Sequence, residues 1–156
     1  MSSTVFIANV DFERIAPWWK LWADPKYRLL RDCYTQTPFR PRETLRAAGD
    51  LVRLSSDGLL FAGAGYETDG GSGPAIDTPA TWRATMAVHD PLYDLLRDRD
   101  LSMLDRGICD ELLRDVMLKD GAWPCRADYY LWGVRRFAAR AAQPGLKQKK
   151  GEAPGV

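Results

Sequence analysis

A glycine-rich segment, TDGGSGPAID (68–77), divides the sequence into two parts with different hydrophobic patterns. Its three glycines and one proline are incompatible with regular structure, and such a backbone can bring N–H groups close to a ligand or ion. Short apolar runs with turn signals precede the segment, and longer stretches with helical spacing follow it. We therefore predict a single α+β domain, with a small antiparallel sheet followed by three helices.

The part before this segment contains apolar runs that are typical of strands. They lie in YRLLRDCYTQ (27–36) and in ETLRAAGDLVRLSSDGLLFAGAGYET (43–68). In the second of these, SSDG separates LVRL from LLFAGAGY and supplies the residues of a hairpin turn. The sequence thus predicts antiparallel pairing of these two runs.

The first predicted helix follows the glycine-rich segment. Thr78 and Pro79 form an N-cap and first-turn signature, so a helix should run from Pro79 to about Arg97. Pro91 lies inside this range, where it removes one backbone donor and crowds the carbonyl of Ala87. We therefore expect a kink or break in the helix just before it.

Two further helices are predicted. Ser102 followed three residues later by Asp105 resembles a capping box, which opens a helix through Met117 or Leu118. The amphipathic stretch RADYYLWGVRRFAARAA (126–142) predicts the last helix, and QPG ends it.

The domain organisation follows from these patterns. Residues 1–26 form an N-terminal Trp-rich segment with Trp18, Trp19 and Trp22 at spacings that fit one packed face or a surface patch. Residues 27–142 form a single globular domain. Residues 143–156 are polar, basic and aperiodic, which predicts a flexible tail.

Composition and charge limit the partners of the chain. Its 156 residues are 46% hydrophobic, which is enough for one domain with a buried core. The formal net charge is only +1, so no global field recruits nucleic acid or an anionic membrane, and partners must be recognised locally. No apolar run reaches the roughly 20 residues of a spanning helix, and no signal peptide is visible. We expect a protein made in the cytoplasm, without a transmembrane segment or a nucleic-acid partner.

His89, the only histidine of the chain, is the centre of the candidate site. Its ordinary pKa near 6.5 suits proton abstraction, provided that an acceptor holds its other nitrogen. Asp90 is adjacent in sequence, but neighbouring side chains on a helix diverge by about 100°. We therefore expect Asp110, on the next helix, to orient the imidazole, with Tyr93 in the same cluster. Asp90 then remains free to join the glycine-rich loop in an oxygen cage for calcium.

Several motifs, in order, resemble a phage and bacterial family called domain of unknown function 1353. The loop GF-x-TDGAS-x-P of that family corresponds to GYETDGGSGP in this sequence. Its helices with HD-x-x-Y, AD-x-x-F and Y-x-x-V-R correspond to HDPLY, CDELL and YYLWGVR. The resemblance covers roughly residues 27–140, with Tyr66 in place of Phe and Gly73 in place of an apolar residue as departures. It implies a phage or prophage origin and partners among other phage structural proteins, but no activity.

A second, local resemblance concerns GGSG, HDPLY and CD, which are similar to the calcium loop, HD-x-x-Y helix and Asp-bearing helix of the secreted phospholipase A-two family. It implies that His89 is the general base, Asp110 orients it, Tyr93 supports the hydrogen-bond network and Asp90 binds calcium. The loop residues proposed for the same ion are Asp69, Gly70, Gly71 and Gly73. The implied reaction is calcium-dependent hydrolysis of an ester or lipid-like substrate, in which His89 activates a water. The dense disulfides of that family are absent, and Pro91 interrupts the helix.

An alternative function remains open. The histidine and its aspartate can pair only to satisfy one another, as part of a rigid polar core. The chain is then a non-enzymatic virion component, incorporated into a phage tail or needed for its assembly.

Other catalytic chemistries are disfavoured. A single histidine excludes a multi-histidine metal centre. The three cysteines, Cys33, Cys109 and Cys125, contain no C-x-x-C pair, and we expect them to be reduced and mostly buried. Ser72 lacks the strand-to-helix elbow of a nucleophilic serine.

Overall fold

The computed structural model describes residues 7–8, 10–17, 19, 27–68, 78–98, 100–140 and 142–144. Within these ranges the chain forms two antiparallel sheets followed by helices, so the predicted α+β class is confirmed. The sequence predicted one sheet where the structure has two. Nearly all of the predicted tail 143–156 lies outside the described residues, as do Trp18 and Trp22 of the Trp-rich segment; Trp19 is 65% exposed.

The larger sheet has the strand order β1-β4-β7-β6-β5, with antiparallel neighbours throughout. Its strands are β1 (Ile7–Ala8), β4 (Cys33–Gln36), β5 (Leu45–Ala47), β6 (Val52–Leu54) and β7 (Leu59–Ala62). Buried and more exposed residues alternate along β4, β6 and β7, as expected for a sheet with one face on the core. The hairpin predicted at SSDG joins β6 to β7 and is confirmed.

The smaller sheet has the order β2-β3-β8. Its strands are β2 (Phe12–Arg14), β3 (Tyr27–Leu29) and β8 (Glu67–Thr68). Both β1 and β2 come from the segment 1–26, for which the sequence predicted no strand. These two strands contain only two and three residues, which is too short for a recognisable alternation.

The first helical region extends from Pro79 to Arg97, as predicted, but without the break that the sequence allowed before Pro91. It consists of α1 (Pro79–Ala84), a π-helical turn (Thr85–His89) and α2 (Asp90–Arg97). Thr78 has the extended backbone of an N-cap residue, but its hydroxyl lies 3.1 Å from that of Thr81 and caps no backbone N–H.

Pro91 changes the type of helix instead of breaking it. Because Pro91 has no N–H to donate, the carbonyl of Ala87 accepts a hydrogen bond from Thr35 Oγ1 of β4, at 3.3 Å. The N–H of Asp90 donates to the carbonyl of Thr85, five residues earlier. The crowding at Pro91 is therefore absorbed by one wider, π-helical turn that ends at His89.

Two helices complete the fold. After a 3-10 turn (Met103–Asp105), α3 extends over Arg106–Lys119 and α4 over Pro124–Phe137. Ser102 begins the turn as predicted, and its hydroxyl accepts a hydrogen bond from the N–H of Leu104 at 3.2 Å. The last helix ends at Phe137, earlier than residue 142, where the sequence placed its end.

None of the helices in the described ranges has the length and apolar character needed to span a bilayer.

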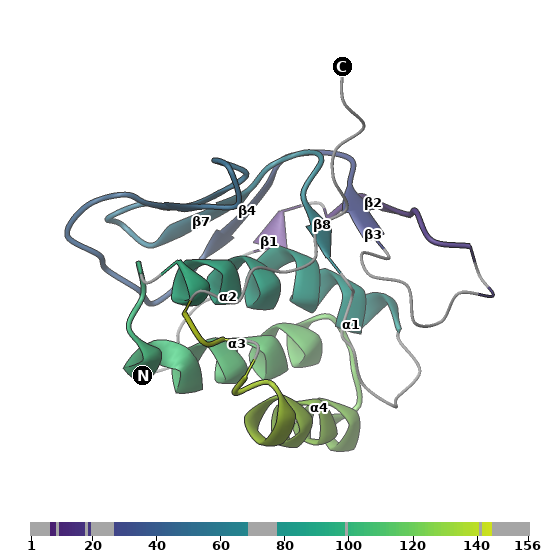
Figure 1. The fold of residues 1–156 in the computed structure, drawn as a ribbon. Coiled ribbons are helices and arrows are strands. Elements are labelled where there is room, and N and C mark those ends of the chain that lie inside the picture. The colour runs from purple at the N-terminus through teal and green to yellow at the C-terminus, as the bar shows by residue number, and fades with distance from the viewer. Residues whose placement is uncertain are drawn as a thin grey trace.

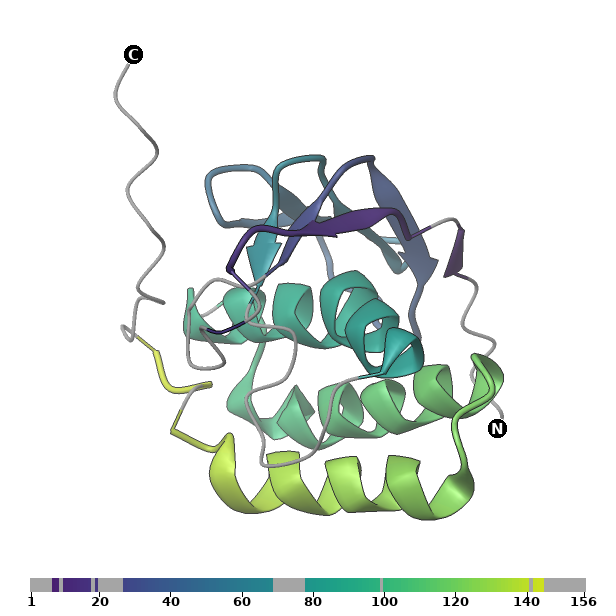
Figure 2. The same cartoon turned by 90° about the vertical axis from the view of Figure 1, so that its right-hand side faces the viewer.

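The elements form successive layers, shown in Figure 1 and, from the side, in Figure 2. The sheets cover one side of α1 and α2, α3 lies against the other side, and α4 packs on α3 (Figures 1 and 2). Because α2 lies between two layers, all eight of its residues are buried. Its polar side chains are therefore held inside the protein.

Gly58, in the hairpin between β6 and β7, is predicted to be irreplaceable. Its φ is +85°, and a Cβ there would lie 2.5 Å from the carbonyl oxygen of Phe39 and 2.7 Å from that of Thr37. We expect Gly58→Ala to lower the free energy of unfolding by about 2–4 kcal/mol, measured by urea denaturation.

Gly65→Ala is the matched control, because Gly65 has a φ of +88° and an added Cβ would meet nothing within 4 Å. It should cost only the conformational penalty of about 1–2 kcal/mol. Equal losses of unfolding free energy in the two variants would mean that the carbonyls of Phe39 and Thr37 do not exclude a side chain at Gly58.

Candidate functional site

Polar side chains line the buried contact between the first helical region and α3. His89 is 6% exposed, Asp90 is 8% exposed and Asp110 is 1% exposed. Buried charges are costly unless other groups pair with them, so each of these side chains requires a partner. The structure supplies these partners from four different elements.

Asp110 on α3 joins His89 and Tyr93, as the sequence predicted. The Tyr93 hydroxyl donates a hydrogen bond of 2.6 Å to Oδ1 of Asp110. Nε2 of His89 lies 3.5 Å from the same oxygen, at the outer limit of a hydrogen bond. The rings of His89 and Tyr93 are 4.2 Å apart between centroids. The three side chains form one compact cluster, which we call the His89 cluster.

Asp90 differs from the sequence-based expectation that it points away from the imidazole. Its Oδ1 lies 3.2 Å from Nδ1 of His89, and its Oδ2 accepts a hydrogen bond from the hydroxyl of Thr68. The expectation assumed regular α-helical spacing, whereas the chain passes from a π-helical turn to α2 between these two residues. At this junction the side chains of His89 and Asp90 turn toward each other.

Arg106 completes the surroundings of Asp110. Its Nε lies 3.5 Å from Oδ2 of Asp110, and its Nη2 donates to the backbone carbonyl of Arg135 on α4, at 3.0 Å. Nε2 of His89, Oδ2 of Asp110 and Nε of Arg106 are all buried and form no hydrogen bond within the described part of the chain. Such unsatisfied buried atoms are uncommon in folded proteins, and three of them gather at this one cluster.

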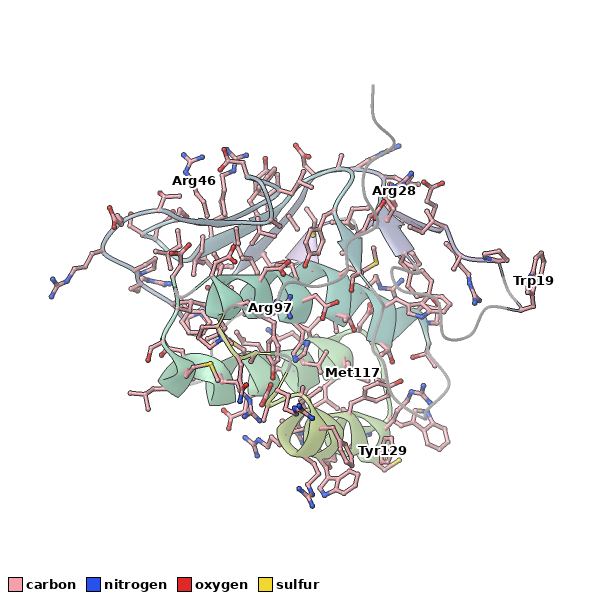
Figure 3. All side chains as sticks on the ribbon, in the orientation of Figure 1. Trp19, Arg28, Arg46, Arg97, Met117 and Tyr129 are labelled. Carbon is pink, nitrogen blue, oxygen red and sulfur yellow. The ribbon has the colours of Figure 1, made fainter. Side chains whose placement is uncertain are left out.

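A neighbouring polar cluster was not found from the sequence. The hydroxyl of Tyr66 donates to Oδ2 of Asp94 at 2.6 Å, and Arg97 pairs with Oδ1 of the same residue. Asp94 lies four residues after Asp90, on the same face of α2, and Arg97 follows it by three residues. This spacing was the available signal, but charged residues on a helix are usually solvent-exposed. Figure 3 shows Arg97 at the centre of the molecule, among the side chains of the helices.

The electrostatics of the His89 cluster favour a protonated imidazole. Burial lowers the pKa of His89, but the interactions with the Asp110 and Asp90 carboxylates outweigh burial and raise the pKa from 6.5 to about 9. Burial and the Asp110 carboxylate raise the pKa of Tyr93, so its hydroxyl remains a donor. At neutral pH the cluster therefore contains a cation between two carboxylates.

The predicted metal ligands are only partly described. Asp69, Gly70, Gly71 and Gly73 lie outside the described residues, and Asp90 is the one member of the set that the structure places. Among the described residues, His, Cys, Asp and Glu side chains nowhere gather in a group of three that could hold a metal ion. Thr68, whose hydroxyl contacts Asp90, is the first residue of the glycine-rich segment 68–77 and the one residue of that segment that the structure describes.

The cysteines are free, and two of the three are buried. Cys33 and Cys109 lie in the core, whereas Cys125 is exposed. Burial raises the pKa of the Cys109 thiol, with a further contribution from the charge of Asp110. A thiolate nucleophile beside His89 is therefore disfavoured. Ser72, the other nucleophile considered, lies outside the described residues.

Comparisons with known proteins add no relative: the chain matches no protein-family model, and neither the curated proteins nor the solved structures include a match. The two resemblances seen in the sequence therefore remain predictions.

The raised pKa of His89 predicts that stability depends on pH. The folded state binds the proton more tightly than the unfolded state, so this stabilisation is complete below pH 6.5 and is lost as the pH rises to about 9. A shift of this size corresponds to on the order of 3 kcal/mol. We expect the free energy of unfolding, measured by urea denaturation at several pH values, to fall over this window.

The control for this prediction is His89→Gln, which carries no titrating group at this position. Its unfolding free energy should be lower at pH 6 but should show a much weaker fall between pH 6.5 and 9. The same slope in both proteins would mean that another group causes the pH dependence.

Proposed function

We propose that the chain is a hydrolase of an ester or lipid-like substrate, with His89 as its general base. Asp110 orients the imidazole from α3, and Tyr93 fixes the Asp110 carboxylate. The observation that carries this proposal is the shared oxygen of Asp110, which accepts the Tyr93 hydroxyl at 2.6 Å and faces Nε2 of His89 at 3.5 Å. An imidazole held from one side by a carboxylate is the arrangement that general-base catalysis requires.

The resting state of the site would be inactive. With a pKa of about 9, His89 is mostly protonated at neutral pH and cannot accept a proton from water. Its Nδ1 is also engaged, because Asp90 Oδ1 lies 3.2 Å away. Activation therefore requires that Asp90 releases Nδ1, so that the imidazole loses its proton and this nitrogen faces the attacking water.

A calcium ion fits the donor chemistry at Asp90. The carboxylate of Asp90 and the hydroxyl of Thr68 are adjacent oxygen donors, and hard cations prefer oxygen ligands. When bound there, together with oxygens of the loop 69–73, the ion supplies a Lewis acid for the ester carbonyl and neutralises the Asp90 charge that holds the proton on His89. Asp90 is thus the residue that couples ion binding to the state of the base.

The phage association of the protein is proposed from the resemblance of GYETDGGSGP, HDPLY, CDELL and YYLWGVR to the phage and bacterial family alone. No contact in the structure bears on it.

The second candidate function is that of a non-enzymatic virion component, for tail or assembly, in which the His89 cluster is structural. The observation that favours it is that both imidazole nitrogens face carboxylates while the side chain is only 8% exposed. A buried charged triad of this kind holds two helices in register, and it needs no substrate to account for it. The hydrolase and the virion component use the same residues, so substituted variants are needed to distinguish the two functions.

Tyr93→Phe and Tyr66→Phe form a matched pair for this purpose. Each removes one buried hydroxyl that donates at 2.6 Å to an aspartate, in the His89 cluster and in the neighbouring cluster respectively. Each should cost about 1–3 kcal/mol of stability, measured by urea denaturation.

If the site is catalytic, only Tyr93→Phe should lower kcat, by roughly tenfold or more, on a chromogenic ester such as p-nitrophenyl butyrate. His89→Gln should remove the activity. Equal activity in the two tyrosine variants, or activity retained in His89→Gln, would reject the hydrolase and favour the structural cluster.

Ion binding at Asp90 is tested by thermal melts with EDTA, calcium, magnesium or zinc. A ligand that binds only the folded protein raises Tm, so we expect an increase with calcium. The increase should disappear in Asp90→Asn and persist in Asp94→Asn, whose carboxylate pairs with Tyr66 and Arg97 instead. If calcium does not change Tm, the calcium part of the proposal is wrong.

A further inference from the structure

The outward side of α4 is covered by aromatic side chains. Trp123 is 77% exposed, Tyr129 is 42% exposed, Trp132 is 57% exposed and Phe137 is 68% exposed. Large apolar side chains are exposed singly on most proteins, but a contiguous group of them marks an interaction site. We call Trp123, Tyr129, Trp132, Arg136 and Phe137 the outer α4 face.

Three rings of this face, those of Tyr129, Trp132 and Phe137, lie next to one another. The centroid of Trp132 is 6.1 Å from that of Tyr129 and 5.7 Å from that of Phe137. The helix is held on α3 by its other side, where Ala127 and Tyr130 are buried. Tyr129 extends outward from α4, away from the other helices and the sheets (Figure 3). Tyr129 also contacts the ring of the buried Tyr130, at 6.1 Å between centroids, whereas Trp132 and Phe137 are mostly exposed.

The charge of this face is positive. Asp128 pairs with Arg114 at 2.5 Å, and Arg135 pairs with Glu111 at 2.8 Å, so these charges are balanced along the contact with α3. Within the described residues, no ion pair engages Arg136 or Arg140. Arg136 lies over the ring of Phe137, with its guanidinium carbon 6.0 Å from the centroid. An occupant of the face must therefore combine negative charge with an apolar layer.

We propose that the outer α4 face binds the surface of an anionic phospholipid bilayer. Trp and Tyr rings favour the level of the headgroups, where the ring is in an apolar layer and its polar edge is hydrated. Arg136 on this face, and Arg140 three residues after the end of α4, can pair with lipid phosphates. A convex helix surface carrying protruding rings suits a flat and fluid partner, into which the rings can insert. The proposal concerns attachment to a lipid surface and does not depend on hydrolysis.

Two other occupants fit the face less well. A second copy of the chain would bring Arg136 and Arg140 close to the same residues of its partner, without acidic side chains on the face to balance them. A single-stranded nucleic acid is bound by ring faces arranged along a basic groove. Here the ring of Phe137 stands nearly perpendicular to that of Trp132, with an interplanar angle of 85°, on a convex helix.

The test uses the full chain and vesicles of ether-linked phosphatidylcholine, with or without an equimolar share of ether-linked phosphatidylglycerol. Ether lipids have no ester to cleave, so this result is independent of the proposed hydrolase. We expect co-sedimentation with the anionic vesicles and at least tenfold weaker binding when the salt concentration is raised from low to high.

Two double variants on the face identify the residues responsible. Both the Trp132→Ala, Phe137→Ala variant and the Arg136→Gln, Arg140→Gln variant should bind anionic vesicles at least tenfold more weakly. Trp19→Ala is the matched control, because Trp19 is 65% exposed and lies at the edge of the molecule, apart from Tyr129 (Figure 3). It should bind like the unmodified protein. Circular dichroism melts confirm that each variant is folded.

Several results would overturn the proposal. Failure to bind anionic vesicles would do so, and so would binding that the two double variants leave unchanged. Binding of an oligothymidylate in preference to vesicles would assign the face to single-stranded nucleic acid. A dimer in sedimentation velocity that the Trp132→Ala, Phe137→Ala variant converts to monomer would assign it to self-association.

Discussion

Because α2 is covered by the sheets on one side and by α3 on the other, its charged residues must find partners inside the protein. Asp90 uses Thr68 of β8 and His89, and Asp94 uses Tyr66 and Arg97. The aspartate from the facing helix, Asp110, is shared in turn by Tyr93 and His89. These contacts join both layers to the central helix, so the polar clusters hold together the same layers that bury them.

Pro91 determines where this network can form. A regular helix would direct the side chains of His89 and Asp90 apart, and the carbonyl of Ala87 would be bonded within the helix. At the end of the π-helical turn, Nδ1 of His89 and Oδ1 of Asp90 lie 3.2 Å apart, and the carbonyl of Ala87 accepts a hydrogen bond from Thr35 of the larger sheet. Because Pro91 has no N–H to donate, it leaves this carbonyl available to attach the helix to the sheet. Deviations of this kind are frequent at functional positions.

Much of this organisation could be predicted from the sequence, because long amphipathic stretches and turn residues carry local signals. The helix over 79–97, the SSDG hairpin and the approach of Tyr93 and Asp110 were all expected from spacing and from the cost of burying a carboxylate. The short strands β1 and β2 could not be predicted, since pairing with distant strands defines them. Nor could the contact of Asp90 with His89, because it depends on side-chain orientations that sequence periodicity does not reveal.

The same electrostatics that stabilise the His89 cluster work against its use as a base. Two carboxylates within 3.5 Å keep the imidazole charged and tie the two helices together, and a charged imidazole cannot accept a proton. A cluster that had only a structural role would stabilise the fold most with both contacts closed. Catalysis instead requires that the contact of His89 with Asp110 stays closed while its contact with Asp90 opens. Each carboxylate also has a partner other than the imidazole: the Tyr93 hydroxyl donates to Oδ1 of Asp110 at 2.6 Å, and the Thr68 hydroxyl donates to Oδ2 of Asp90.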